Sequence, residues 1–168
     1  MAQAYWSSVF TSSADETWAV VRRFNGLPDW LPAIRASGII GGEGGLTPGA
    51  VRLLTGVDGG IYRERLVGLD DAGRKLSYEI VEAPLPVRGY RSTLHVQPVS
   101  DTGGAFLSRH ATFEPAEGTT AQDATAILEA ACAPAPRRPP HDHRLTPDGS
   151  RHVRGHRSPT MKEAPPPA

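Results

Sequence analysis

The sequence predicts an α+β domain in which a curved antiparallel sheet of seven strands holds a helix against one face. Six consecutive segments alternate between apolar and polar residues, and short turns such as "DDAG" and "SDTGG" join them. Strands with such short connections are antiparallel, because parallel neighbours need long crossovers. A further strand and a helix precede this run, and another helix follows it. The predicted order is therefore strand, helix, six strands, helix.

The first two elements are a short strand and a capped helix. "AYWSSVF" (4–10) is aromatic and partly alternating, as in a strand. In "SADETWAVVRRF", Ser13 and Glu16 have the spacing of a capping box. "NGLPDWLP" ends this helix and leaves room for only a short turn of another. The apolar face of the helix has the spacing i, i+4 and i+7: Ala14, Trp18 and Val21.

The rest of the predicted domain is a run of strands and a final helix. Alternation with period two implies that one face of the sheet is packed or lines a cavity, while the other is wet. In "TAQDATAILEAAC" (120–132), Thr120 and Asp123 again have capping-box spacing, which predicts a helix. The six strands are predicted at 33–40, 49–56, 60–70, 74–83, 89–99 and 104–115.

Charge is unevenly distributed along the chain. Residues 1–132 carry 11 Lys and Arg against 15 Asp and Glu, whereas residues 133–168 carry 7 against 3. A nucleic-acid-binding domain usually presents a basic face, and the basic segment here lacks aromatic residues for base stacking. We therefore expect no nucleic-acid partner.

The sequence also limits the compartment and the cofactors. Cys132 is the only cysteine, which rules out an internal disulfide and a zinc site built mainly from cysteines. The start, "MAQAYWSSVF", lacks the pattern of a signal peptide, and no apolar run is long enough to cross a bilayer. The glycines of "GGEGG" lack the spacing of a phosphate-binding loop. We expect a cytoplasmic protein without membrane insertion, metal or cofactor.

Several phrases in this order resemble the START-like superfamily, called SRPBCC in its broad form, and within it the polyketide cyclase/dehydrase and lipid-transport branch. They span about residues 4–130, and no single phrase is diagnostic. The phrases are "ADETWAVVRRFNGLPDWLPAI", "GAVRLL", "YRERLVGLDD", "LSYEIVEAPLPVRGYRSTLHVQPV" and "ATFEP".

The resemblance implies a helix-grip fold, in which the seven-stranded sheet wraps around a long C-terminal helix and leaves an apolar cavity. Members bind lipids, polyketides, hormones or other hydrophobic small molecules, and a minority catalyse cyclisation or dehydration. Plant abscisic-acid receptors share this architecture. The two loops that enclose their ligand correspond to residues 55–60 and 83–87 here.

Alternation assigns one parity of the last four strands to the sheet face that bears the cavity. The alternative is that these side chains form an ordinary filled core. The resemblance adds a basic ligand-contacting residue of the hormone receptors, which it places at Arg35. The predicted ligand-binding residues are Arg35, Tyr62, Glu64, Leu66, Tyr78, Ile80, Tyr90, Ser92, Leu94, Arg109 and Phe113.

Glu64 is the first polar candidate among these residues. A buried carboxylate must be paired, hydrogen-bonded or protonated, so Glu64 is a candidate to orient a ligand hydroxyl or to act as a general acid or base. The alternative is a structural ion pair with Arg52 or Arg35 across neighbouring strands. For Arg35, pairing with Glu64 is the role we expect.

Arg109 is unusual, because many relatives carry an aromatic residue, usually Trp, at the matching place. Facing inward, its guanidinium would suit a ligand carboxylate. Alternatively, a bulge turns Arg109 toward water. His95 and His110 have the opposite parity, and we expect them to face outward.

Three functions follow. The first is binding of a hydrophobic small molecule, such as a lipid or a polyketide-like compound. The second is a polyketide cyclase or dehydratase that uses Glu64 as general acid/base, with Tyr62, Tyr78 or Tyr90 orienting the substrate. The third is a partner-binding module that uses the two loops as a ligand-gated surface. The sequence identifies no protein partner.

We predict a ligand-binding domain at 1–132 and a disordered tail at 133–168, which contains 9 of the 16 prolines and 4 of the 6 histidines. The last helix has twelve residues, about 18 Å, whereas gripping a sheet roughly 30 Å wide needs about twenty. An ending rich in Arg, Pro and His is typical of an out-of-frame reading of GC-rich DNA. A frameshift near codon 131 is one hypothesis, and a natural variant with a flexible tail is the other.

Overall fold

A computed structural model describes residues 1–42 and 44–132. The predictions of a disordered or out-of-frame segment concern residues 133–168 and lie outside this range. Two α-helices, one 3-10 helix and seven strands occur in the predicted order. They are β1 (Ala2–Phe10), α1 (Ala14–Val21), η1 (Phe24–Asp29), β2 (Ile34–Ile39), β3 (Val51–Gly56), β4 (Ile61–Asp70), β5 (Lys75–Glu82), β6 (Val87–Val99), β7 (Gly104–Pro115) and α2 (Ala121–Cys132).

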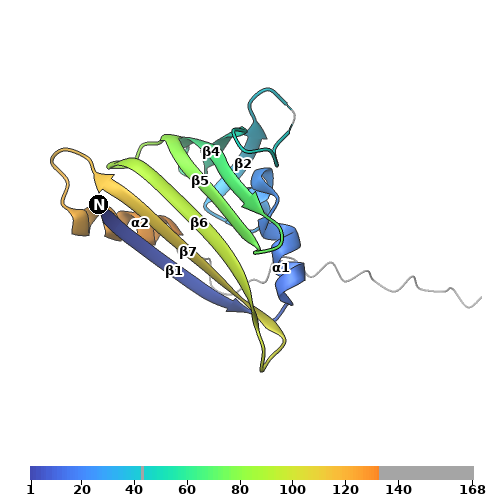
Figure 1. Ribbon diagram of the computed structural model, residues 1–168. Coiled ribbons are helices and arrows are strands. Elements are labelled where there is room, and N and C mark those ends of the chain that lie inside the picture. The colour runs from blue at the N-terminus through green and yellow to red at the C-terminus, as the bar shows by residue number, and fades with distance from the viewer. Residues whose placement is uncertain (43, 133–168) are drawn as a thin grey trace, which may run out of the picture.

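The seven strands form one antiparallel sheet with the order β1-β7-β6-β5-β4-β3-β2. The helices α1 and η1 lie toward one end of the curved sheet, and α2 lies beside β1 and β7 (Figure 1). This arrangement confirms the predicted α+β class and is consistent with the helix-grip fold.

A capping box starts α1, as the sequence predicts. The Glu16 backbone N–H donates to the Ser13 hydroxyl, and the Glu16 carboxylate accepts from the Ser13 backbone N–H at 2.8 Å. The helix buries Ala14, Trp18 and Val21 against the sheet. These contacts fix the helix entry and its apolar face, and so determine which α1 residues face the sheet.

The turn between β4 and β5 holds α1 in place through Asp71. The Trp18 indole N–H donates to the Asp71 carboxylate at 2.9 Å, and Arg22 donates to both carboxylate oxygens. The hydrogen bonds from Arg22 and then Trp18 lower the pKa of Asp71 below its ordinary value. One exposed carboxylate therefore connects α1 to a turn 49 residues further along the chain.

The helix α2 packs against β1 and β7. Its start is capped as predicted, because the Asp123 backbone N–H donates to the Thr120 hydroxyl at 3.1 Å. Ala124 and Leu128 are its buried residues. Among the described residues, no helix is both long and apolar enough to span a membrane.

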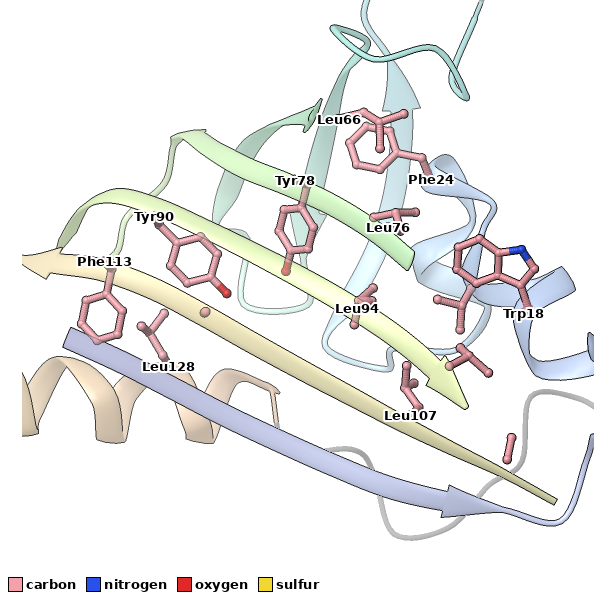
Figure 2. Close-up of a cluster of buried hydrophobic side chains, with 14 of the residues drawn as sticks. Trp18, Phe24, Leu66, Leu76, Tyr78, Tyr90, Leu94, Leu107, Phe113 and Leu128 are labelled. Carbon is pink, nitrogen blue, oxygen red and sulfur yellow. The ribbon is translucent and has the colours of Figure 1, made fainter. Parts of the chain in front are cut away.

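One continuous core lies on the sheet face that bears the helices. Side chains from α1, η1, α2 and strands β4 to β7 contribute to it, as Figure 2 shows. The inward parity predicted for β4 to β7 is confirmed, since Leu66, Leu76, Tyr90 and Leu107 are each at most 1% exposed. Part of this face is filled by the core, and part of it borders a pocket.

Candidate functional site

A pocket of about 300 Å³ lies on the inner face of the sheet. Its walls come from all seven strands, from α1 and η1, from the segment between η1 and β2, and from Leu128 and Ala131 of α2. Each predicted loop contributes as well, through Val57 and Asp58 in one and Leu85 in the other. A mostly apolar hollow with few polar groups is the usual form of a small-molecule site.

Six of the eleven residues predicted to bind ligand line this pocket, and five do not. The buried residues Leu66, Tyr90, Ser92 and Phe113 belong to the filled part of the inner face, and Arg35 is exposed. For these four buried residues, the structure shows the ordinary filled core that was the alternative to a cavity. The six pocket residues are Tyr62, Glu64, Tyr78, Ile80, Leu94 and Arg109.

Glu64 forms a buried ion pair with Arg52, which lies directly opposite it on β3. Arg52 donates from Nε and Nη2 to Oε2 of Glu64, at 2.8 and 2.5 Å. The side chains are only 3% and 6% exposed. A buried pair of charges is tolerated when the geometry is good and further hydrogen bonds satisfy it. The ion pair anticipated for Glu64 is present, with Arg52 as the partner.

Arg52 also connects the sheet to η1. Its Nη1 donates to the Phe24 carbonyl, and its guanidinium lies 4.1 Å from the centroid of the Phe24 ring. Among the described residues, none donates a hydrogen bond to Oε1 of Glu64, and Glu64 lines the pocket. One carboxylate oxygen thus pairs with Arg52, and the other accepts no hydrogen bond from a described residue.

The pairing of Arg35 with Glu64 was a wrong prediction. Arg35 is exposed on β2, the edge strand, and β3 separates β2 from β4. The pairing register of β2 shifts between Ile34 and Ala36, where the strand is irregular. At this irregularity Ile34, and not Arg35, lines the pocket. Alternation alone does not reveal such a shift.

Arg109 faces inward, and β7 is regular on both sides of it, opposite Trp6 on β1 and Leu94 on β6. The bulge considered as an alternative is absent from these pairings. The Arg109 Nε donates to the Ser92 hydroxyl at 3.4 Å, and Nη2 donates to the Tyr90 hydroxyl. Its guanidinium lies 5.9 Å from the Tyr90 ring. Hydroxyl groups and aromatic faces thus surround a charge at the pocket wall.

Tyr62 lies at the β3–β4 side of the pocket, next to the loop that contains Asp58. Burial, and then the charge of Asp58, raise the pKa of the Tyr62 phenol above its ordinary value. The Asp58 carboxylate accepts from the Gly60 backbone N–H at 2.9 Å, which fixes the loop conformation. The phenol is therefore a neutral hydrogen-bonding group at physiological pH.

Several pocket residues were missed by reasoning from the sequence. Trp6 and Phe10 point into the pocket from β1, and the alternation of "AYWSSVF" could have indicated them. Trp30 also lines the pocket, although "NGLPDWLP" signalled only a helix break. The Trp30 indole Nε1 is buried and has no hydrogen-bond partner among the described residues.

The two histidines in residues 1–132, His95 and His110, are not among the pocket residues. His110 is exposed and His95 is half-buried. Burial, and then the charge of Lys75, lower the pKa of His95. In residues 1–42 and 44–132, no three His, Cys, Asp or Glu side chains form a group that could hold a metal ion.

Comparison with known proteins agrees with this geometry. A family model described as polyketide cyclase/dehydrase and lipid transport matches residues 1–135. The structure of the protein XoxI from Bacillus cereus is 32% identical, with a TM-score of 0.70 over 78% of this chain and 87% of that chain. An uncharacterised protein from Bacillus thuringiensis is 30% identical, with a TM-score of 0.69 over 77% and 90%. A structure from Thermobifida fusca is 26% identical, with a TM-score of 0.68 over 78% and 85%.

The family match extends over most of the chain, and the two Bacillus proteins share both its fold and at least 30% of its aligned residues. The resemblance drawn from the sequence phrases is thereby confirmed. This chain belongs to the polyketide cyclase/dehydrase and lipid-transport family.

Proposed function

We propose that this protein binds a hydrophobic small molecule in the pocket between the inner face of the sheet, α1 and α2. The observation that carries the proposal is the apolar pocket of about 300 Å³, whose walls include both loops predicted to enclose a ligand. A family that covers lipid transport and polyketide chemistry is compatible with a hydrophobic ligand of this kind.

The volume of the pocket limits the size of the ligand. Its 300 Å³ lies at the low end of the range for small-molecule sites, about 300 to 1,000 Å³. This volume corresponds to about ten waters at about 30 Å³ each. A compact molecule, such as a one- or two-ring polyketide-like compound or a short single chain, fits this volume better than a two-chain lipid.

Glu64 supplies orientation in this proposal. Arg52 holds Oε2, so the carboxylate is fixed, and Oε1 accepts a hydrogen bond from a ligand hydroxyl. A hydrogen bond to a charged acceptor is stronger than one to a neutral acceptor. Since Arg52 already balances the charge of Glu64, the pair itself favours a neutral ligand group.

Two variants of neighbouring residues on β5 test the proposal. Ile80→Trp adds volume inside the pocket, whereas Val81→Trp adds the same ring on the opposite, exposed face of the strand. The probe is 2-naphthol, titrated by calorimetry. We expect wild type and Val81→Trp to bind it and Ile80→Trp to lose binding while still melting cooperatively. Equal binding by all three proteins would place the probe elsewhere and contradict the proposal.

Native mass spectrometry of the purified chain complements this titration. A copurified hydrophobic molecule is expected in the wild type and in Val81→Trp, and it should be depleted in Ile80→Trp. Its mass identifies the ligand class directly. A molecule retained equally by both variants would not occupy this pocket.

A polyketide cyclase or dehydratase is the second candidate, because Oε1 of Glu64 lines the pocket without a hydrogen-bond donor from the described residues. A positioned carboxylate of this kind can take up or deliver a proton. Replacement of Glu64 by Gln separates the two functions. An enzyme loses turnover of the copurified compound while still binding it, whereas a binder shows no turnover in either form.

A further inference from the structure

Trp30 carries a polar group that the fold leaves unsatisfied. Its indole Nε1 is buried, and no described residue accepts a hydrogen bond from it. The indole N–H of Trp6, the other tryptophan of the pocket, is not a buried donor without a partner. The indole N–H of Trp18 donates to Asp71. Buried donors without acceptors are rare because their desolvation is not compensated. Such a group within a ligand pocket is therefore a candidate for a ligand contact.

The backbone around Trp30 leaves the side chain as the element that can adjust. Trp30 follows η1 directly, and prolines at positions 28 and 32 restrict the backbone on both sides. The Trp30 backbone N–H donates to the Leu27 carbonyl at 3.3 Å. The indole itself is half-buried at the pocket wall. A rotation of the ring about its side-chain bonds requires no change in this backbone.

We propose that Trp30 turns its indole N–H toward a hydrogen-bond acceptor on the bound ligand, such as a ketone or ether oxygen. This inference rests on the proposed function of the same pocket and adds a feature of the ligand. Glu64 offers an acceptor for a ligand donor, and Trp30 offers a donor for a ligand acceptor. The ligand class is therefore a compact apolar molecule that carries a carbonyl or ether oxygen as well as a hydroxyl.

Two probes of similar shape test this assignment. 2-Acetonaphthone has a ketone oxygen, and 2-isopropylnaphthalene replaces that oxygen with a methyl group. Both are titrated by calorimetry into wild type, Trp30→Phe and Trp6→Phe, where Trp6→Phe is the matched control from the same pocket. The measured quantity is the ratio of the two dissociation constants, which cancels general effects of each substitution on the pocket.

We expect Trp30→Phe to shift this ratio against the ketone by about three- to tenfold, the effect of one neutral hydrogen bond. We expect Trp6→Phe to leave the ratio unchanged. If both probes bind and Trp30→Phe does not alter the ratio, the assignment of Trp30 is overturned while the binding function stands. If neither probe binds to the wild type, the proposed function itself fails.

A second measurement does not depend on the stability of a variant. The chain has three tryptophans, so a ¹⁵N-labelled wild-type sample gives three indole N–H resonances. We expect one of them to move downfield with the ketone and much less with the hydrocarbon, and the other two to respond equally to both probes. Equal responses of all three resonances would overturn the proposal.

Discussion

Glu64→Gln tests whether the buried ion pair is needed for the fold. The substitution keeps the shape of the side chain but removes the negative charge next to Arg52, which is only 3% exposed. Breaking a buried pair from one side costs about 3 to 5 kcal/mol, because the other charge stays buried without its partner. The hydrogen bond and ring contact between Arg52 and Phe24 persist, so we expect about 3 kcal/mol.

Urea unfolding followed by circular dichroism measures this loss. With a denaturant slope of about 2 kcal/mol/M, a loss of about 3 kcal/mol lowers the midpoint by about 1.5 M. The matched control is Glu82→Gln, the same substitution in the Arg63–Glu82 pair, whose side chains are 50% and 64% exposed. An exposed pair contributes about 0 to 1 kcal/mol, so its midpoint should fall by at most about 0.5 M.

The double variant Arg52→Met/Glu64→Met removes both charges together. Apolar replacement of a whole buried pair is often neutral or stabilising, so we expect a midpoint near that of the wild type. Two results would refute the reasoning. One is a Glu64→Gln midpoint as close to wild type as that of Glu82→Gln, and the other is a double variant less stable than Glu64→Gln.

Three further substitutions test other parts of the structure. Hydrogen bonds from Arg22 and Trp18 lower the pKa of Asp71 in the folded state. The ionised carboxylate therefore stabilises the fold at pH values above its unfolded pKa near 3.8, and this stabilisation is lost as the pH falls through the folded-state pKa. Asp71→Asn should therefore flatten the pH dependence of the melting temperature below about pH 4, and an unchanged profile would contradict this. The pKa of the Tyr62 phenol is raised, so one tyrosine of the wild type should ionise above pH 10 when tyrosinate absorbance is followed, and Tyr62→Phe should remove that step. If Tyr62→Phe instead removes a step at or below pH 10, the Tyr62 phenol is not buried as described. Ser13→Ala removes the side-chain half of the α1 cap and should cost about 1 kcal/mol in urea unfolding, whereas no loss would mean that water replaces the cap.

The fold could be predicted from the sequence because each level of the pattern agrees with the next. Short turns require antiparallel pairing, and alternation in β4 to β7 places the correct parity inside, from Tyr62 to Phe113. The capping box of α1 is present at the predicted position, and α2 follows the predicted cap residue Thr120, whose hydroxyl accepts from the Asp123 backbone N–H. These features depend on neighbours that are close in sequence, so a single chain is enough to reveal them.

The limits of the pocket could not be predicted in the same way. Alternation shows that Tyr90 and Tyr78 share a face, but whether a space remains beside each depends on elements far away in the sequence. Arg35 was taken from the resemblance and not from alternation, and it is exposed on β2, where the pairing register shifts between Ile34 and Ala36. Trp30 lies in a segment without periodicity, where only the three-dimensional arrangement shows the orientation of a side chain.

The two oxygens of Glu64 join the stability of the fold to ligand binding. Oε2 pairs with Arg52, and Arg52 in turn contacts Phe24 of η1, while Glu64 is also a lining residue of the pocket. A single substitution at Glu64 therefore changes two things together: the ligand acceptor and the charge balance of Arg52, the residue that contacts η1. Weakened binding by Glu64→Gln alone does not separate these causes.

The double methionine variant does separate them. It removes the acceptor and leaves no unpaired charge, but it also removes the contacts of Arg52 with Phe24. A loss of 2-naphthol binding is therefore due to the missing carboxylate when a probe without the hydroxyl still binds. 2-Methoxynaphthalene lacks the hydroxyl, and its affinity should be the same or higher in the more apolar pocket. If 2-naphthol binding also survives in the double variant, Glu64 does not orient the ligand, and its role is confined to the ion pair that joins β3, β4 and η1.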